Sequence, residues 1–76
     1  MSLLSPCKRR EFICKLCKLG FSGPFVGRKH HFMIYKEYRL AIPSNREYSI
    51  PQLKMMLGEI ESILERRIVT EEWCNL

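Results

Sequence analysis

Two adjacent histidines are the residues with the clearest potential for chemistry. His30 and His31 are the only histidines of the chain, and they lie between the cations Arg28 and Lys29 and an alternating apolar run that begins at Phe32. Imidazole titrates near neutral pH, so it can take up and release a proton there, while neighbouring cations can hold a phosphodiester beside it. The segment therefore indicates acid/base chemistry on a phosphate.

The same residues also fit a structural interpretation. A histidine in a strand is more often part of the packing than of an active site, and Arg28 and Lys29 are equally typical of an ordinary turn.

A further alternative is metal binding, because Cys14 and Cys17 have a spacing that occurs in zinc sites. That pair lies within a predicted helix and no second close pair follows it, which disfavours zinc.

The charge of the chain is unevenly distributed. Its 76 residues carry a formal net charge of +5. Residues 1–58 hold 11 of the 13 Lys and Arg but only 3 of the 8 Asp and Glu, so the histidine segment lies in the basic part. Such a balance favours a polyanionic partner through counterion release, although a solvated basic face is the alternative.

The length of the chain limits what it can enclose. A domain of this size buries only about 60% of the surface of its unfolded chain, so an open face is expected rather than a deep pocket. An open face suits an extended substrate such as a nucleic acid strand.

No apolar run has the length of a signal peptide or a membrane span. We therefore expect a cytoplasmic protein with no membrane partner, in which Cys7, Cys14, Cys17 and Cys74 are reduced.

The first predicted element is a helix. Ser5 is its expected N-cap, Pro6 its first residue and Gly20 the residue after its end. Apolar side chains at helical spacing form one stripe that faces a core. This stripe consists of Phe12, Ile13, Leu16 and Leu19, and Cys7, Arg10 and Cys14 are expected on the opposite side.

Three extended segments follow, at residues 21–26, 30–35 and 39–42. The second and third are joined by residues 36–38, which is short enough for a hairpin. Pro24 cannot donate a hydrogen bond within a sheet, so the first segment is expected at an edge or with a bulge.

Two helices complete the predicted elements. Ser49 and Gln52 form a capping box in which the Gln52 side chain reaches back to the Ser49 amide, and the helix continues to about Glu65. A short helix that carries Trp73 and Leu76 starts at Thr70. The residues expected to share the core are Leu16, Phe21, Leu57 and Ile60.

This order predicts a single α+β domain over residues 1–76. The elements follow one another as α-β-β-β-α with a short C-terminal helix. Each long helix offers one apolar stripe, and both stripes need a common surface. We therefore expect a three-stranded antiparallel sheet with two helices on one face.

Alternation along the second strand divides its residues between the two faces of the sheet. His30, Phe32 and Ile34 point to one face, and His31, Met33 and Tyr35 point to the other. If the helices cover Met33, then His30 lies on the open face with Arg39 nearby, and His31 starts the inward row. Exposed Phe32 and Ile34 on that face are typical of a surface that binds another protein.

The pattern as a whole resembles the HicA family of bacterial toxins, small mRNA interferases that a HicB antitoxin holds inactive. The resemblance covers most of residues 8–60 and implies a fold like that of a double-stranded RNA-binding domain. The matching segments are Lys8 to Phe12 with Leu16 and Gly20-Phe21, Gly27 to Met33, Leu40 to Pro43, and Ser49 followed by Leu53 and Leu57.

The resemblance also implies a site and partners. The catalytic histidine of the family matches His30, with Lys29 where many members carry serine and Arg28 where many carry glycine. The implied activity is cleavage of single-stranded mRNA without a metal or a small-molecule cofactor, and Arg28, Lys29 and Arg39 would neutralise the phosphate. A HicB-like antitoxin would bind at Phe32 and Ile34.

The alternative is an RNA-binding module of the same fold without catalysis. Such modules bind through phosphate and 2′-hydroxyl contacts and need basic residues at a helix start and in a loop. Lys54 and Arg46 are the only obvious candidates for those positions.

Overall fold

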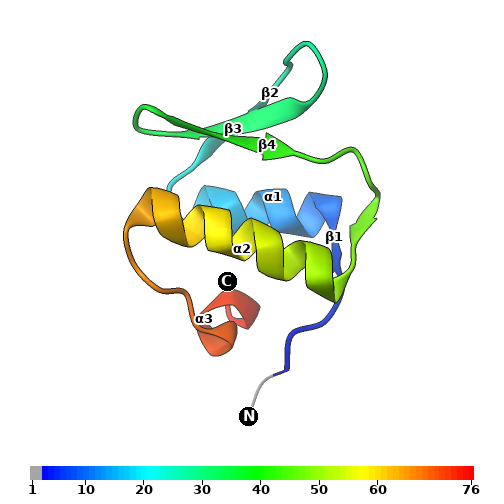
Figure 1. The fold of residues 1–76 in the computed structure, drawn as a ribbon, viewed down its shortest axis with the longest axis vertical. Coiled ribbons are helices and arrows are strands. Elements are labelled where there is room, and N and C mark those ends of the chain that lie inside the picture. The colour runs from blue at the N-terminus through cyan, green and yellow to red at the C-terminus, as the bar shows by residue number, and fades with distance from the viewer. Residues whose placement is uncertain (1–2) are drawn as a thin grey trace.

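The computed structural model describes residues 3–76, which form a sheet, a pair of helices and a short third helix (Figure 1). Met1 and Ser2, the first residues of the predicted domain 1–76, lie outside the described residues. The elements are β1 (Cys7–Lys8), α1 (Arg9–Lys18), β2 (Ser22–Phe25), β3 (His31–Tyr35), β4 (Tyr38–Ile42), β5 (Glu47–Tyr48), α2 (Ile50–Leu64) and α3 (Thr70–Cys74).

The main sheet is antiparallel in the order β2-β3-β4. Its three strands lie within two residues of the predicted segments, and Lys36 and Glu37 form the tight turn between β3 and β4. Pro24 lies in the edge strand β2, whose register with β3 is irregular between Ser22 and Phe25. The prediction of an edge strand or a bulge at Pro24 is confirmed.

Both long helices pack on one face of this sheet, and α3 lies on the far side of the helix pair (Figure 1). The predicted α+β class is therefore confirmed, with a three-stranded antiparallel sheet and two helices on one of its faces. α3 is held by its Trp73, whose carbonyl oxygen accepts a hydrogen bond from Lys15 Nζ at 2.7 Å. None of the helices in residues 3–76 is long and apolar enough to cross a membrane.

The start of α1 differs from the prediction. The helix begins at Arg9 rather than after Ser5, because Cys7 and Lys8 pair with Tyr48 and Glu47 in a second, two-stranded sheet. Cys7 is consequently buried, with 4% of its surface exposed, and does not lie on the outer side of the helix. Long-range strand pairing has overridden the local capping signal.

The end of α1 agrees with the prediction. Gly20 has a φ of 107°, a conformation that side chains disfavour. Its N–H donates to the Cys17 carbonyl at 3.1 Å, and the Phe21 N–H donates to the Leu16 carbonyl at 3.0 Å. This pair of bonds is the Schellman motif, in which glycine is the usual residue.

α2 begins with half of the predicted capping box. The Gln52 N–H donates to Ser49 Oγ at 3.4 Å, as expected. The Gln52 side chain instead donates to Asn45 Oδ1 at 3.4 Å, because the preceding loop brings that amide within reach. The helix ends at Leu64, followed by Glu65 in the left-handed conformation with a φ of 57°.

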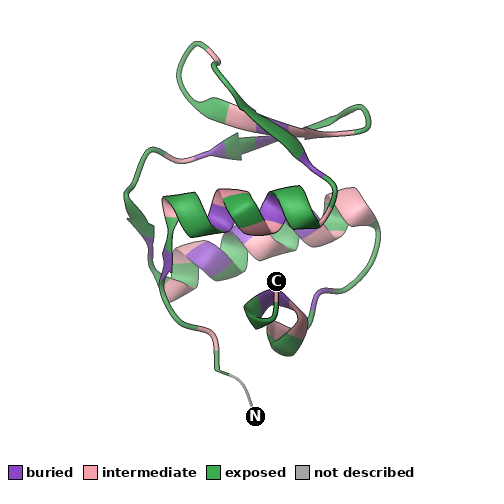
Figure 2. Cartoon of the chain, turned by 180° about the vertical axis from the view of Figure 1, so that it is seen from behind, coloured by how far each residue is buried: buried purple, intermediate pink, exposed green. Residues whose placement is uncertain are grey.

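The core lies between the sheet and the helix pair and extends beneath α3. Phe12 is fully buried, and its ring contacts Tyr48 at 5.2 Å and Trp73 at 5.3 Å between centroids. Leu57 is only half-buried at the edge of this cluster, so its predicted place in the core is corrected to the margin. Figure 2 shows buried positions recurring along α1, α2 and the strands. The fully buried set is Phe12, Leu16, Met33, Leu40, Ile42, Tyr48, Leu53, Met56 and Ile60, with Phe21 at 4% exposure.

Candidate functional site

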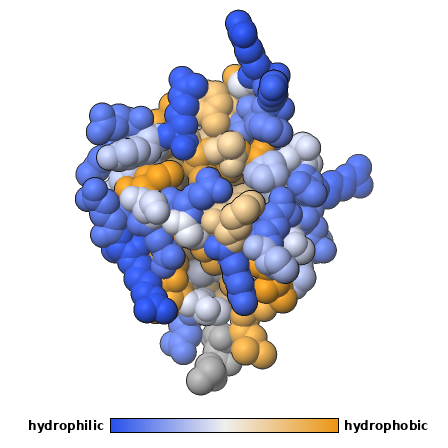
Figure 3. All heavy atoms as spheres, in the orientation of Figure 1, coloured by the Kyte–Doolittle hydropathy of each residue, from blue (hydrophilic) through white to orange (hydrophobic). Residues whose placement is uncertain are grey.

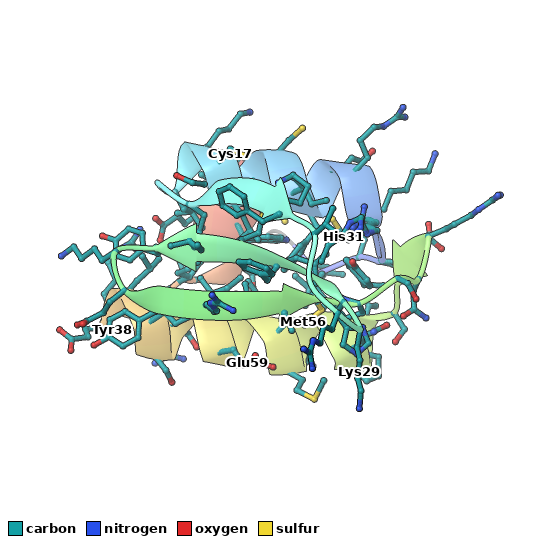
Figure 4. The ribbon with its side chains drawn as sticks, turned by 90° about the horizontal axis from the view of Figure 1, so that it is seen from above. Cys17, Lys29, His31, Tyr38, Met56 and Glu59 are labelled. Atoms are coloured by element: carbon teal, nitrogen blue, oxygen red, sulfur yellow. The ribbon has the colours of Figure 1, made fainter. Side chains whose placement is uncertain are left out.

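Both histidines line one open hollow at the end of the main sheet. The hollow lies between the loop before β3, the start of α1 and the end of β4, and Figure 4 shows Lys29 and His31 at this end of the sheet. Its lining consists of Arg9, Lys29, His30, His31, Ile42 and Ser44. Two imidazoles and two cations therefore surround one solvent-accessible space.

His30 reaches this hollow because it precedes the strand. β3 begins at His31, so the alternation of faces along a strand does not apply to His30. The turn before the strand is tight at Gly27, where an added Cβ would collide with the His30 carbonyl oxygen. The glycine thus allows the loop to fold back on itself and present His30, whose side chain is exposed.

His31 starts the inward row, as predicted, but it is not buried with the rest of that row. It pairs with Ile42 at the end of the sheet and shares the inward side with buried Met33. The ring is nevertheless exposed, and Arg9 Nη2 donates to its Nδ1 at 2.9 Å. The inward row thus ends beside the first turn of α1, where His31 contacts the polar side chain of Arg9 and not the apolar core.

Arg9 is the functional candidate that sequence reasoning missed. Its Nε donates to the Pro43 carbonyl at 3.3 Å, and its backbone N–H donates to the Arg46 carbonyl at 2.9 Å. A signal for it was present, because a cation in the first turn of a helix opposes the helix dipole and so calls for another partner. That partner, His31, lies 22 positions away in the chain.

Tyr48 supports Arg9 from the core. Its hydroxyl donates to the same Pro43 carbonyl at 2.7 Å, and the residue is fully buried. Burial raises the pKa of the Tyr48 phenol above its ordinary value, and the nearby Arg9 cation offsets only part of that rise. The phenol therefore remains a neutral donor at neutral pH, which fixes the carbonyl that holds Arg9.

The predicted phosphate contacts are not all in one place. Lys29 lines the hollow with His30, whereas Arg28 is an exposed residue of the loop and is not part of the lining. Arg39 is directed to the open face of the sheet, opposite Ile34, where its guanidinium carbon lies 4.5 Å from the centroid of the Phe32 ring. Arg39 therefore does not line the hollow with His30, and the prediction that the two residues lie together in one site is not supported by the lining.

The predicted protein-binding surface is only partly exposed. Phe32 and Ile34 lie on the open face of the sheet, but both are half-buried. The ring of Phe32 is covered by Arg39 and by the ring of Phe25, at 5.6 Å between centroids. Phe25 and Val26, at 42% and 82% exposure, contribute more apolar surface next to them. Apolar and hydrophilic side chains are likewise mixed on the side of the molecule that carries α2, which Figure 3 draws.

The cysteines do not form bonds with one another. Cys14, Cys17 and Cys74 are exposed and free, and Cys7 is free but buried. Burial raises the pKa of the Cys7 thiol, and the charge of Glu11 adds to the rise. Within residues 3–76, no three His, Cys, Asp or Glu side chains gather as a metal site would require.

Comparisons of the chain with protein-family models, with curated proteins and with solved structures find no match. The candidate site therefore rests on its own geometry and chemistry. That geometry brings together one exposed histidine, a second histidine held by an arginine, and one free lysine side chain that lines the same space.

Proposed function

We propose that this protein is a HicA-type toxin, a metal-independent endoribonuclease that cleaves single-stranded mRNA in the cytoplasm. The observation that carries the proposal is the open hollow lined by His30, His31, Arg9 and Lys29. A proton-transfer group and a cation that can bind phosphate, together in one accessible place, are what phosphodiester cleavage requires.

The proposed reaction uses the ribose of the substrate as its nucleophile. His30 takes the proton from a 2′-hydroxyl, whose oxygen forms a bond to the adjacent phosphorus. The bond from phosphorus to the 5′-oxygen breaks, and that oxygen takes a proton from solvent water. The products are a 2′,3′-cyclic phosphate and a 5′-hydroxyl, and no metal or cofactor enters the balance. The same His30 could instead give a proton to the leaving oxygen, as the acid of the reaction.

The shape and charge of the protein support an extended anionic substrate. The hollow is open to solvent and both of its cations lie at its rim or wall, so a strand can lie across it without being enclosed. Eleven of the 13 Lys and Arg precede Gly58, in the part of the chain that contains every residue lining the hollow. Arg28 and Arg39 are the further cations proposed to contact RNA.

The proposal includes a fold and a protein partner. The order α1-β2-β3-β4-α2, with both helices on one face of the sheet, is the arrangement expected of a domain like the double-stranded RNA-binding domain. The open face next to the hollow carries Phe32 and Ile34, extended by Phe25 and Val26. A HicB-like antitoxin that covers this face would block access to His30, and hydrogen exchange with that partner should show protection over residues 28–40.

The test is RNA cleavage by the purified protein in the presence of a chelator. A single-stranded RNA is incubated with the wild-type protein, with His30→Ala, and with Lys18→Ala as a matched control that removes a cation from the other end of α1. We expect products that end in 2′,3′-cyclic phosphate from the wild type and the control, and none from His30→Ala.

Other results of the same assay would favour different functions. RNA that is bound but not cleaved would favour the non-catalytic RNA-binding module. Equal cleavage by the wild type and His30→Ala would exclude His30 as the proton-transfer group and indicate a contaminating nuclease. Activity that the chelator abolishes would contradict the metal-independent mechanism.

A further inference from the structure

The contact between Arg9 and His31 defines the state of the second histidine. A guanidinium group has N–H donors and no acceptor, so Nδ1 of His31 must be the acceptor in the 2.9 Å contact. A ring whose Nδ1 accepts carries its single proton on Nε2. In this tautomer His31 lines the hollow and can donate its Nε2–H to a ligand.

The same contact makes His31 a poor proton-transfer group. A second proton on the ring would have to sit on Nδ1, where it would face a donor N–H of Arg9, and two cations would then be in contact. The guanidinium is also held by the Pro43 carbonyl, which accepts from Arg9 Nε, and the Arg46 carbonyl holds the Arg9 backbone N–H. Taking up and releasing protons at His31 would break this arrangement in every turnover.

We infer that His31 is a neutral hydrogen-bond donor to a non-bridging oxygen of the scissile phosphate and that Arg9 is its positioning residue. His30 is then the only group in the hollow that transfers a proton. The inference rests on the proposed function and divides the roles of the two histidines. It gives His31 a role in stabilising charge on phosphate oxygens as the new O–P bond forms.

The first test compares the pH–rate profiles of variants. His31→Ala should lower the cleavage rate about 10²-fold, at the low end of what the loss of one transition-state donor costs. The shape of its pH profile should match that of the wild type, because the proton-transfer group is still present. His31→Gln should recover part of the rate, since its amide supplies an N–H donor but no acid/base group. Loss of one limb of the profile in His31→Ala would overturn the inference.

The second test is a double-mutant cycle between Arg9 and His31. Arg9→Met should slow cleavage in the wild-type background, mainly in kcat. In the His31→Ala background the same substitution should change the rate by less than about twofold, since its effect passes through His31. Additive losses, or a loss confined to KM, would mean that Arg9 binds the phosphate directly and would overturn its positioning role. Thermal unfolding of each variant separates these effects from loss of fold.

A third measurement does not depend on activity. The ¹⁵N shifts of the His31 ring in the folded protein should show the neutral tautomer with its proton on Nε2, and Arg9→Met should give a mixture of tautomers. A proton on Nδ1 in the wild type would overturn the inference while leaving the proposed function intact. A wild-type protein that does not cleave RNA would overturn the proposed function, and the catalytic role of His31 with it, whatever the tautomer.

Discussion

The guanidinium of Arg39 lies over the ring of Phe32, with 4.5 Å between its carbon and the ring centroid. These residues lie on neighbouring strands and face away from the helices. A cation above an aromatic face is attracted by the ring quadrupole, and it also covers apolar surface that would otherwise contact water. The open face is therefore less apolar than the alternation of the sequence predicts.

Lys29 and Arg39 should differ in their effect on RNA binding. We expect Lys29→Ala to lower the slope of log affinity against log salt concentration by about 0.7, the value for one lost phosphate contact on a single strand. Arg39→Ala should have a smaller effect, because the guanidinium already contacts Phe32 and does not line the hollow. Binding isotherms at several salt concentrations measure both. Equal changes in slope would place the RNA across the sheet face as well.

His30→Ala should separate activity from stability. One positioned acid/base group contributes about 10²- to 10⁴-fold to a rate, so cleavage and growth inhibition should both be lost. The melting temperature should stay close to that of the wild type, because the side chain is exposed and supports no packing. Parallel loss of stability and activity would make His30 a structural residue.

Leu53 and Leu57 should differ in their contribution to stability. Leu53 is fully buried in the core, and Leu53→Ala should lower the free energy of unfolding by about 2 to 5 kcal/mol. Leu57→Ala should cost clearly less, because that side chain is only half-buried at the margin. Chemical denaturation of the two variants tests the ranking. An equal or larger loss for Leu57→Ala would show that α2 presents a different face to the sheet.

Ionisation of the Tyr48 phenol should lower the free energy of unfolding at alkaline pH. Burial raises the pKa of its phenol in the folded state, so the unfolded chain loses its proton first as the pH rises. The contribution of the neutral phenol is therefore complete below the pKa of the unfolded tyrosine, about 10, and is lost as the pH rises through the higher folded value. Tyr48→Phe should lack this decline in the free energy of unfolding. It should also be less stable at neutral pH by about 1 kcal/mol, the typical net value of a hydrogen bond.

The four thiols should react at different rates with a thiol reagent. Cys14, Cys17 and Cys74 are exposed and should react at once in the folded protein. Cys7 is buried and its raised pKa disfavours the thiolate, so it should react only when the protein opens. Titration before and after addition of denaturant counts both classes. Rapid reaction of all four thiols in the native protein would contradict the pairing of Cys7 in β1.

The sequence determined the elements whose formation depends on nearby residues. Gly20 ends α1 because the left-handed conformation there suits glycine, and Ser49 caps α2 through an N–H three residues away. The strands around Met33 and Leu40 followed from alternation, and the position of Pro24 at an edge followed from its missing N–H. In each case the deciding interaction lies within a few residues along the chain.

Tertiary structure alone decided the arrangement of the site. Cys7 is buried because it pairs with Tyr48, which overrides the helix start expected after Ser5. His31 is held by Arg9 rather than by the core because the end of β3 meets the start of α1. Such contacts join residues that are 22 to 41 positions apart. The local conformational preferences of the residues do not determine which of these contacts form. They form because the whole apolar core fixes where the ends of the elements meet.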